Sequence, residues 1–600
     1  MTDHRTHPMG TMGTGRIEAL CDGVFAIIMT ILVFLIFMGI IAASTSKDPV
    51  EVKENSILLA KFNAQILDRT NEDPFALLFS GNFMYDEMMG LNQILKDLEK
   101  AKADENIKGI FMNLGAVSAG IATLGEIREA MQDSKDSGKY IYAYSNAYTQ
   151  TSYYLASVAD SVFMTPEGMF LFNGMSAQVM FYKKALEKVG VEMQVIRHGT
   201  YKGAVEPFLR DDLSEENREQ IEGYVGALWG KILDDISESR EISTEKLNQI
   251  ADEMATIDSE KLVETGMIDG LIYYDEMLSL MKEKMGVEEK DDLEAVSLKQ
   301  YKDAPVKKKK EYSRDKIAVI YAMGSVVDGD AGEGYIGGNR ISKAIRKARR
   351  DKSVKAIVFR INSGGGSGSA SDVIHREVML AAKEKVVVAS MGDVAASGGY
   401  YIAAPADTIL AGPGTITGSI GVFGLFPNVE KLMKDKIGIN TDVVKTNENA
   451  DILNAFDPLD PEERLIIQKM IDDFYINFVN IVAEGRGKSY EEIDAIAGGR
   501  VWAGSDALEL GLIDMYGGLN KSIEVAAEMA GLENYRVQSL PRLEDPMAAI
   551  MKQLTGGSIV NTDRILKREL GPGYSHYRKI QELQQLHGIQ AIMPYEIELH

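Results

Sequence analysis

Residues 386–409 read VVVASMGDVAASGGYYIAAPADTI, and the chain carries a second version of this stretch 247 positions earlier. There, residues 141–162 read IYAYSNAYTQTSYYLASVADSV. The matched pairs are Tyr153 with Tyr400, Tyr154 with Tyr401, and Asp160 with Asp407. Further along, residues 211–236 parallel residues 457–482 with nearly the same offset. Repetition over this distance predicts two large domains that share one fold.

The two copies differ at the positions where chemistry is expected. Gln150 stands where the second copy has Ser397, and Lys202 stands where the second copy has Asn449. One copy therefore supplies an amine and the other a hydroxyl. Because a serine hydroxyl is a poor nucleophile without an adjacent base, this reciprocity predicts a single Ser/Lys site assembled from both copies.

Each copy opens with a short apolar run, at residues 57–60 and 317–320, and then alternates such runs with stretches of helical periodicity. This alternation predicts βα units, a mostly parallel sheet covered by helices, and the α/β fold class. Residues 557–586 do not show this alternation, and their pattern predicts one or two surface helices. The expected divisions are a tail over 1–22, a membrane helix over 23–43, the first copy over 55–300, a basic linker over 301–315, the second copy over 316–555, and a tail over 556–600.

Composition excludes several classes of function. Sixty-five basic and 89 acidic residues give a net charge of −24, which argues against nucleic-acid binding. The one basic run, Lys307–Lys310, reads as a solvated linker. The single cysteine, Cys21, excludes internal disulfides, and the seven histidines lack the paired spacing of a helical zinc site. We therefore expect no metal and no cofactor.

Residues 23–43 form an uncharged apolar run of 21 residues. As a helix, a run of this length spans about 30 Å of hydrocarbon, which predicts one transmembrane helix. A cleaved signal peptide is the alternative, because residues 42–44 resemble a small-residue cleavage site. The run exceeds the roughly 7–15 apolar residues of a signal peptide, so the retained anchor is the preferred interpretation.

Charge does not encode the orientation of this helix. Arg5 and Arg16 precede it, whereas Lys47 and Lys53 follow it, which leaves almost no positive-inside bias. The side of the membrane must therefore be inferred from function.

Residues 16–33, RIEALCDGVFAIIMTILV, resemble the first helix of a potassium-channel family of bacteria and lysosomes, whose hallmark is R-x3-F-S-D-G-V-F-A-I. Leu20 and Cys21 depart from that hallmark, and the further membrane helices of such a channel are absent from the sequence. We therefore expect an exchanged or fused N-terminus that serves as an anchor.

Ser397 follows a predicted strand and opens a helix, where unpaired amides and the helix dipole favour developing negative charge. The glycine-rich loop over residues 360–368 and the amide of Gly398 are candidates for an oxyanion hole. An ordinary N-cap serine is the bland alternative. A phosphate cradle is disfavoured because the P-loop and dinucleotide-binding patterns are missing. His198 and His375 are alternative bases, although no sequence feature ties either to the serine.

Lys202 lies among small and apolar residues in TYKGAVEPF. Desolvation there favours the neutral amine, and lowering a lysine pKa to ~7 requires roughly 4–5 kcal/mol. A solvated surface lysine is the default interpretation of the residue type alone, so the case for Lys202 depends on its place in the repeat.

Together these residues resemble the long, duplicated form of the signal peptide peptidase A family, also called the protease IV family. The resemblance covers roughly residue 50 to the C-terminus and implies a membrane-anchored serine protease with a ClpP/crotonase-like fold. Its motifs stand in family order as GTYKGAVEPFLRDD, RINSGGGSGSASD, SMGDVAASGGYYIAAPAD, GTITGSIGVFG and GRVWAGSDALELGLID.

The resemblance implies a role for each site residue. Ser397 would be the nucleophile and Lys202 the general base, with Ser419 orienting the lysine and helping to lower its pKa. The amides of Gly365 and Gly398 would form the oxyanion hole. The sequence departs from the family directly before Gly365, because residue 364 is glycine where the family usually has proline. This difference removes a φ constraint from the loop.

The same resemblance implies a homotetramer with its sites facing a cavity near the bilayer. The substrates would be cleaved signal-peptide remnants and other extended apolar peptides, with lipid contacted by one helix and no cofactor or nucleic acid. The location would be the bacterial inner membrane, with a single pass and the catalytic domains on the periplasmic or extracellular side. Two alternatives remain open: a crotonase-like acyl-CoA enzyme, and a membrane-bound scaffold that binds peptides without cutting them.

Overall fold

The computed structural model describes residue 29 and residues 50–70, 88–305, 313–543 and 589–593. The predicted membrane helix, the basic run and the predicted tail helices lie outside these residues, apart from Met29. Within the described ranges, no helix is long and apolar enough to cross a bilayer. By internal contacts the chain divides into a small unit, residues 1–52 with 299–305, and a large unit that holds both copies.

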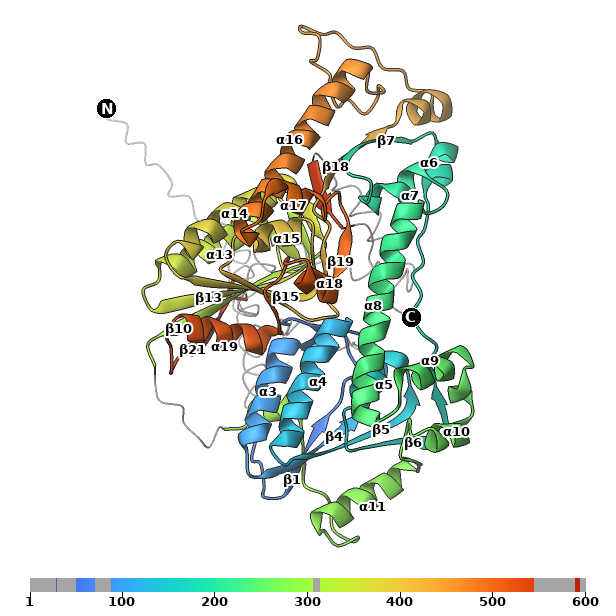
Figure 1. The fold of residues 1–600 in the computed structure, drawn as a ribbon, viewed down its shortest axis with the longest axis vertical. Helices are drawn as coiled ribbons and strands as arrows, with labels where there is room; N and C mark the ends of the chain where they lie inside the picture. The colour runs from blue at the N-terminus through green and yellow to red at the C-terminus, as the bar shows by residue number, and fades with distance from the viewer. Residues whose placement is uncertain (1–28, 30–49, 71–87, 306–312, 544–588, 594–600) are drawn as a thin grey trace, which may run out of the picture. The chain divides into compact units, whose positions relative to one another are not determined.

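The first copy is built on a six-stranded sheet in which all neighbouring strands are parallel. The order is β8-β6-β5-β4-β1-β9. Helices α3 and α4 cover one face of this sheet and α11 the other (Figure 1). The bounds are β1 Ser56–Ala60, β4 Ile107–Asn113, β5 Tyr140–Tyr148, β6 Ser161–Phe170, β8 Gly270–Leu271, β9 Ala295–Ser297, α3 Leu91–Ala103, α4 Ile121–Asp136 and α11 Tyr274–Met285.

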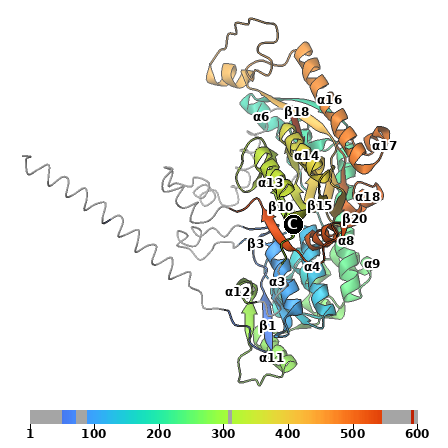
Figure 2. The ribbon, with the colours of Figure 1, turned by 90° about the vertical axis from the view of Figure 1, so that its left-hand side faces the viewer.

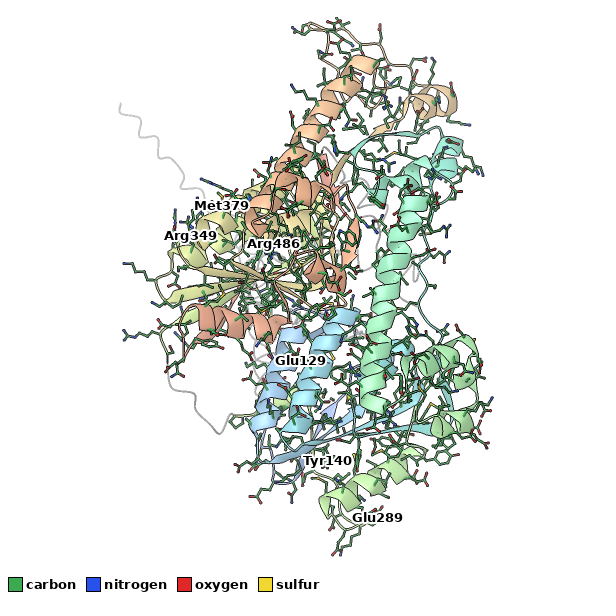
Figure 3. The ribbon with its side chains drawn as sticks, in the orientation of Figure 1. Glu129, Tyr140, Glu289, Arg349, Met379 and Arg486 are labelled. Carbon is green, nitrogen blue, oxygen red and sulfur yellow. The ribbon has the colours of Figure 1, made fainter. Side chains whose placement is uncertain are left out.

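The second copy repeats this plan on an eight-stranded sheet, which follows the path β19-β17-β15-β13-β10-β21, with β16 and β20 branching from β15. Every pairing is parallel except that of β17 with β19. Helices α13 and α14 cover one face, and Figure 3 labels Arg349 and Met379 on them. The bounds are β10 Lys316–Met323, β13 Val354–Ser363, β15 Val386–Ala396, β16 Thr408–Ala411, β17 Ile416–Gly418, β19 Val501–Ala503, β20 Met515–Tyr516, β21 Arg536–Leu540, α13 Gly338–Arg350 and α14 Gly368–Ala382.

The central strands of this sheet are buried on both faces. Val387, Val388 and Ala389 of β15 are each 1% exposed or less. Helix α19 (Leu519–Met529) covers the face opposite α13 and α14 (Figures 1 and 2). Parallel strands that are covered on both faces have near-continuous apolar runs. The run VVVAS in the sequence therefore predicts this strand. The predicted α/β class with mostly parallel sheets is confirmed.

Equivalent side chains make equivalent contacts in the two copies. In each, a tyrosine hydroxyl donates to a backbone carbonyl of a later segment, and an aspartate accepts from a strand amide. The pairs are Tyr153 with Met267 and Tyr400 with Leu512, both at 2.6 Å, and Asp160 with Ile141 at 2.7 Å and Asp407 with Val387 at 2.8 Å. The duplication therefore extends to individual hydrogen bonds.

Helix α16 (Pro461–Arg486) shows how local sequence sets an element. The carboxylate of Asp460 accepts the amides of residues 462 and 463, and Pro461 occupies the first turn, where no amide donor is needed. The helix stops at Gly487, which adopts the left-handed conformation. Its counterpart α8 (Glu215–Arg240) has the same length of 26 residues and begins after Ser214.

A third sheet combines strands from distant parts of the chain. Its order is β12-β11-β14-β22-β18-β7. Strand β7 (Glu192–His198) comes from the first copy and pairs antiparallel with β18 (Val422–Asn428) of the second, and the two lie side by side in Figure 1. Strand β22 (Ile589–Ile592) comes from the C-terminal tail. The other bounds are β11 Ser325–Val327, β12 Tyr335–Gly337 and β14 Gly365–Ser367.

The remaining elements are short or lie at the periphery of these sheets. Their bounds are β2 Ile66–Leu67, β3 Met89–Gly90, α5 Gln150–Ala156, α6 Lys183–Val189, α7 Glu206–Leu209, α9 Thr244–Asp252, α10 Ser259–Glu264, α12 Leu298–Tyr301, α15 Gly398–Ala403, α17 Tyr490–Asp494 and α18 Gly504–Glu509.

A buried ionic cluster joins the two copies. Arg360 of β13 is fully buried and donates to Asp68 at 2.6 Å and to Glu126 of α4 at 2.6 Å, both from the first copy. Glu126 also accepts the amide of Leu519 at 2.7 Å. Burial raises the pKa of Glu126, and the charge of Arg360 opposes that effect. The arginine therefore keeps two buried carboxylates compensated.

Replacing Arg360 with alanine should destabilise the protein by about 3–5 kcal/mol, because two carboxylates would lose their buried partner. Urea denaturation followed by circular dichroism measures this. The matched control is Lys343→Ala, which removes an exposed ion pair with Asp330 and should cost no more than about 1 kcal/mol. Equal losses in the two variants would contradict the assignment.

Candidate active site

Ser397 lies at the turn between β15 and α15, and its side chain is fully buried. It has a φ of 54° and a ψ of −116°, a conformation that L-residues with a side chain rarely adopt. Its amide donates to the carbonyl of Gly418 at 2.8 Å, which holds the turn in place. Local strain of this kind persists where surrounding structure fixes it, and it clusters at functional sites. The predicted position at a helix N-terminus is confirmed.

Lys202 reaches this serine through the sheet that the two copies share. After β7 ends at His198, the chain turns and brings Lys202 to Ser397 and Ser419 of the second copy. Gln220 of α8 fixes this turn, because its side chain donates to Tyr201 O at 2.9 Å and accepts from Val501 N at 3.0 Å. The lysine of the first copy thus reaches the second copy because hydrogen bonds fix the backbone before and after it.

The amine and the hydroxyl meet within one chain. Lys202 Nζ lies 2.7 Å from Ser397 Oγ, and neither side chain is exposed to solvent. Nζ also lies 3.0 Å from both the hydroxyl and the carbonyl oxygen of Ser419. The structure therefore brings together the three polar side chains that the sequence placed in one site.

These contacts match the hydrogen-bonding capacity of a neutral amine. An uncharged Lys202 has two N–H donors, which meet the two oxygens of Ser419, and one lone pair, which can accept the Ser397 hydroxyl. The Ser419 hydroxyl can in turn donate to Gly499 O at 3.3 Å. Burial lowers the pKa of Lys202 well below the ordinary 10.5. An uncharged amine is the form that can take a proton from serine.

Two glycines outside the predicted set make room for this lysine. A Cβ at Gly499, whose φ is 89°, would lie 2.8 Å from Lys202 Cα. A Cβ at Gly421 would stand 3.4 Å from Lys202 Cδ. Both belong to the GSIGV and GGRVWAG segments, and the paired glycines at 498–499 were the available signal in the sequence. Their part in seating the lysine was missed.

The two glycines expected to form the oxyanion hole are neighbours. Gly365 has a φ of 99°, and a Cβ there would lie 2.7 Å from the amide nitrogen of Gly398. The Gly365 amide donates to Ser363 Oγ at 3.1 Å. One of the two expected oxyanion donors therefore has an internal partner in this structure.

The two histidines considered as alternative bases are engaged elsewhere. His198 Nδ1 lies 2.7 Å from Asp472, and its ring stacks on Tyr475 at 3.8 Å. His375 packs its ring edge-on against Tyr401. The group that contacts the serine hydroxyl most closely is the Lys202 amine.

Gln150, the first-copy residue at the place of Ser397, begins α5, and its side-chain oxygen accepts the amide of Gly174 at 3.1 Å. Asn449, the second-copy counterpart of Lys202, lies exposed in a turn. At these two positions the first copy therefore has no serine and the second copy has no lysine.

Comparison with known proteins identifies the class. The model of Peptidase family S49 matches residues 133–288 and again residues 379–533, one match in each copy. The chain belongs to this peptidase family. Because both copies match in the same frame, the comparison also supports the duplication.

Two relatives are similar to this chain over most of its length, and a third is similar over a shorter part. Protease 4 of Salmonella typhi is 37% identical over 476 residues, which cover 78% of this chain and 76% of the relative. Serine protease SPPA, chloroplastic, of Arabidopsis thaliana is 34% identical over 553 residues, covering 90% and 78%. A putative signal peptide peptidase SppA of Enterococcus faecium is 34% identical over 174 residues, covering 29% and 50%.

The family match and the similarity to these proteases identify the protein as a serine peptidase. The predicted enzyme class and the resemblance in the sequence are confirmed. The comparison favours the peptidase over the acyl-CoA enzyme and the non-catalytic scaffold.

The buried lysine should cost stability, which gives a test that does not depend on activity. Its pKa is lower in the folded chain than in the unfolded chain, so the unfolded state binds more protons at pH values between the two. Stability attributable to this residue therefore rises as pH rises towards the unfolded value of about 10.4. Lys202→Met should raise the melting temperature at pH 7 and flatten that slope.

Differential scanning fluorimetry between pH 6 and pH 10 would measure both effects. Lys343→Met, at an exposed lysine, is the control and should leave the slope unchanged. A Lys202→Met protein that melts well below the parent at pH 7 would show that the native lysine is charged and compensated.

Proposed function

We propose that Ser397 and Lys202 form the catalytic dyad of an endopeptidase that works through an acyl-enzyme. The observation that carries the proposal is the 2.7 Å separation of a buried amine and a buried hydroxyl contributed by the two copies. Hydrogen-bond contact between nucleophile and base is the geometry that serine activation requires.

In the proposed first step, Lys202 Nζ accepts the Ser397 proton while Oγ bonds to the carbonyl carbon of the scissile peptide. The resulting oxyanion is held by the amides of Gly365 and Gly398, for which the Gly365 amide exchanges Ser363 Oγ for the substrate. The ammonium then gives its proton to the leaving amine as the C–N bond breaks. A serine ester of the N-terminal fragment remains.

In the second step, water gives its proton to Lys202 and attacks the ester carbonyl. The ester C–O bond breaks, and the proton returns to Ser397 Oγ. Ser419 keeps the amine oriented in both steps through its two contacts with Nζ. No cofactor takes part in this scheme.

We propose extended apolar peptides as substrates, and signal-peptide remnants among them. The support is the resemblance of the motifs to the signal peptide peptidase A family and the similarity to the putative signal peptide peptidase SppA of Enterococcus faecium. Apolar side chains would be favoured because burial stabilises by about 25 cal/mol per Å² of apolar area. A ClpP/crotonase-like fold and a homotetramer belong to the same proposal.

Replacing Ser397 with alanine should abolish cleavage of a synthetic signal peptide, and Lys202→Ala should lower kcat by about 10³-fold or more. Mass spectrometry of the peptide fragments detects the loss, and a peptide boronate should label the parent but not Ser397→Ala. The Lys343→Ala protein serves as control. Undiminished cleavage by either site variant would refute the dyad.

The pH dependence of kcat/KM should report the lysine. Protonated Lys202 cannot accept the serine proton, so activity falls as pH falls through the lysine pKa in the free enzyme. Burial places that pKa well below 10.5. We therefore expect an ascending limb that is complete before pH 10, whereas a limb still rising at pH 10.5 would count against a desolvated base.

We also propose that residues 23–43 anchor the protein in the bacterial inner membrane with the two copies on the periplasmic or extracellular side. The support is the 21-residue uncharged run together with the family resemblance. The full chain should stay in the membrane pellet during alkaline carbonate extraction, and a variant lacking residues 23–43 should move to the supernatant. A full chain released by carbonate would contradict the anchor.

A further inference from the structure

The C-terminal strand β22 occupies a groove beside Ser397. It inserts between β14 and β18 and pairs antiparallel with both. On one side Ala591 lies opposite Gly366, and on the other Gln590 lies opposite Phe423. One flanking strand carries Gly365, and the other begins three residues after Ser419. The groove is therefore walled by the two strands that lead into the candidate active site.

The backbone of this segment meets the glycines expected to bind the oxyanion. A Cβ at Gly365 would overlap the carbonyl oxygen of Ala591, and a Cβ at Gly398 would lie 3.1 Å from it. Two residues further, the amide of Met593 donates to Gly364 O at 2.5 Å. The carbonyl group of Ala591 thus lies against both glycines, and the chain continues past them along the loop.

Three side chains of the segment, those of Gln590, Ala591 and Met593, are buried, whereas Ile589 and Ile592 are half-buried. Ala591 is fully buried, and Gln590 is 3% exposed. Ala591 belongs to the main apolar core of the second copy, next to residues of β18 and α14. A fully enclosed alanine means that this position accepts a small apolar side chain.

We propose that residues 589–593 are an intramolecular peptide ligand that holds the substrate groove closed to other peptides. Strand addition offers one set of backbone donors and acceptors along each edge, so a second extended peptide cannot bind while β22 is in place. The segment and a substrate peptide compete for the same two edges. This inference rests on the proposed function, because it takes the groove beside Ser397 to be the substrate site.

The register of β22 also defines the peptide that the groove binds. It is an extended chain running antiparallel to β14, with a small apolar residue at the position of Ala591 and its carbonyl oxygen beside Gly365 and Gly398. Because the ligand is part of the chain, it acts at an effective concentration of order millimolar. A free peptide therefore binds only to the fraction of molecules in which the segment has left.

Binding can be measured without turnover in an Ser397→Ala background. The probe is a fluorescent peptide with the sequence of residues 588–594, GIQAIMP. Three proteins are compared: the full chain, a chain ending at residue 593, which keeps β22, and a chain ending at residue 588, which lacks it. We expect the chain ending at 588 to bind about tenfold more tightly or better, and the chain ending at 593 to match the full chain.

A full-length variant guards against misfolding of the shortened chain. Ala591→Arg places a long charged side chain in an enclosed position, so it should displace the segment and give the same gain in probe affinity. Its melting temperature and circular dichroism spectrum, measured beside those of the parent, test whether the two copies remain folded. A probe in which arginine replaces the alanine should bind none of the proteins.

The outcomes separate this inference from the dyad. Equal probe affinity in all four proteins would overturn the closed groove, whatever Ser397 does. Loss of the dyad would instead appear as signal-peptide cleavage that survives Ser397→Ala in the chain ending at residue 588. Tighter binding in the Ala591→Arg and 588 chains, with no change in the 593 chain, supports the intramolecular ligand.

Discussion

The site depends on the backbone pairing of β7 with β18. Seven residues of the first copy, Glu192 to His198, align with seven of the second. This ladder carries Lys202 across to Ser397, over 195 positions of sequence. A lysine on a mobile loop would remain hydrated and charged. Here the backbone bonds of the sheet hold the amine in a dry interior, and the buried Arg360 cluster holds the copies together at a second point.

Burial gives the lysine its chemical character. Its pKa is lowered by desolvation, and the polar groups that contact Nζ are two serine hydroxyls and one carbonyl. A carboxylate at the same distance would have stabilised the ammonium and raised the pKa instead. The two serines whose hydroxyls meet this nitrogen, Ser397 and Ser419, both adopt positive φ values, 54° and 50°.

The sequence predicted the fold class and the pairing of Lys202 with Ser397, because both follow from features that a repeat makes visible. Apolar runs such as residues 386–390 predict strands from local sequence alone. The absence of the serine from the first copy and of the lysine from the second indicates where the site lies. By contrast, β7 and β22 adopt strand structure because of the distant strands with which they pair. Strand β22 has four residues and pairs with segments more than 160 positions away, which no local pattern encodes. The sequence analysis placed Arg360 only in the glycine-rich loop over residues 360–368, since nothing near it in sequence points to Asp68 or Glu126. The roles of Gly365 and Gly398 remain predictions.

The division of the reactive groups between the copies has a consequence for biosynthesis. A ribosome completes the segment with Lys202 long before it reaches Ser397, and the partner strand β18 follows later still. A growing polypeptide consequently holds the amine in a half that has no nucleophile, and the second half alone would have a serine without its amine. Under the proposed dyad, hydrolysis therefore requires that both halves have been translated and that β7 has paired with β18.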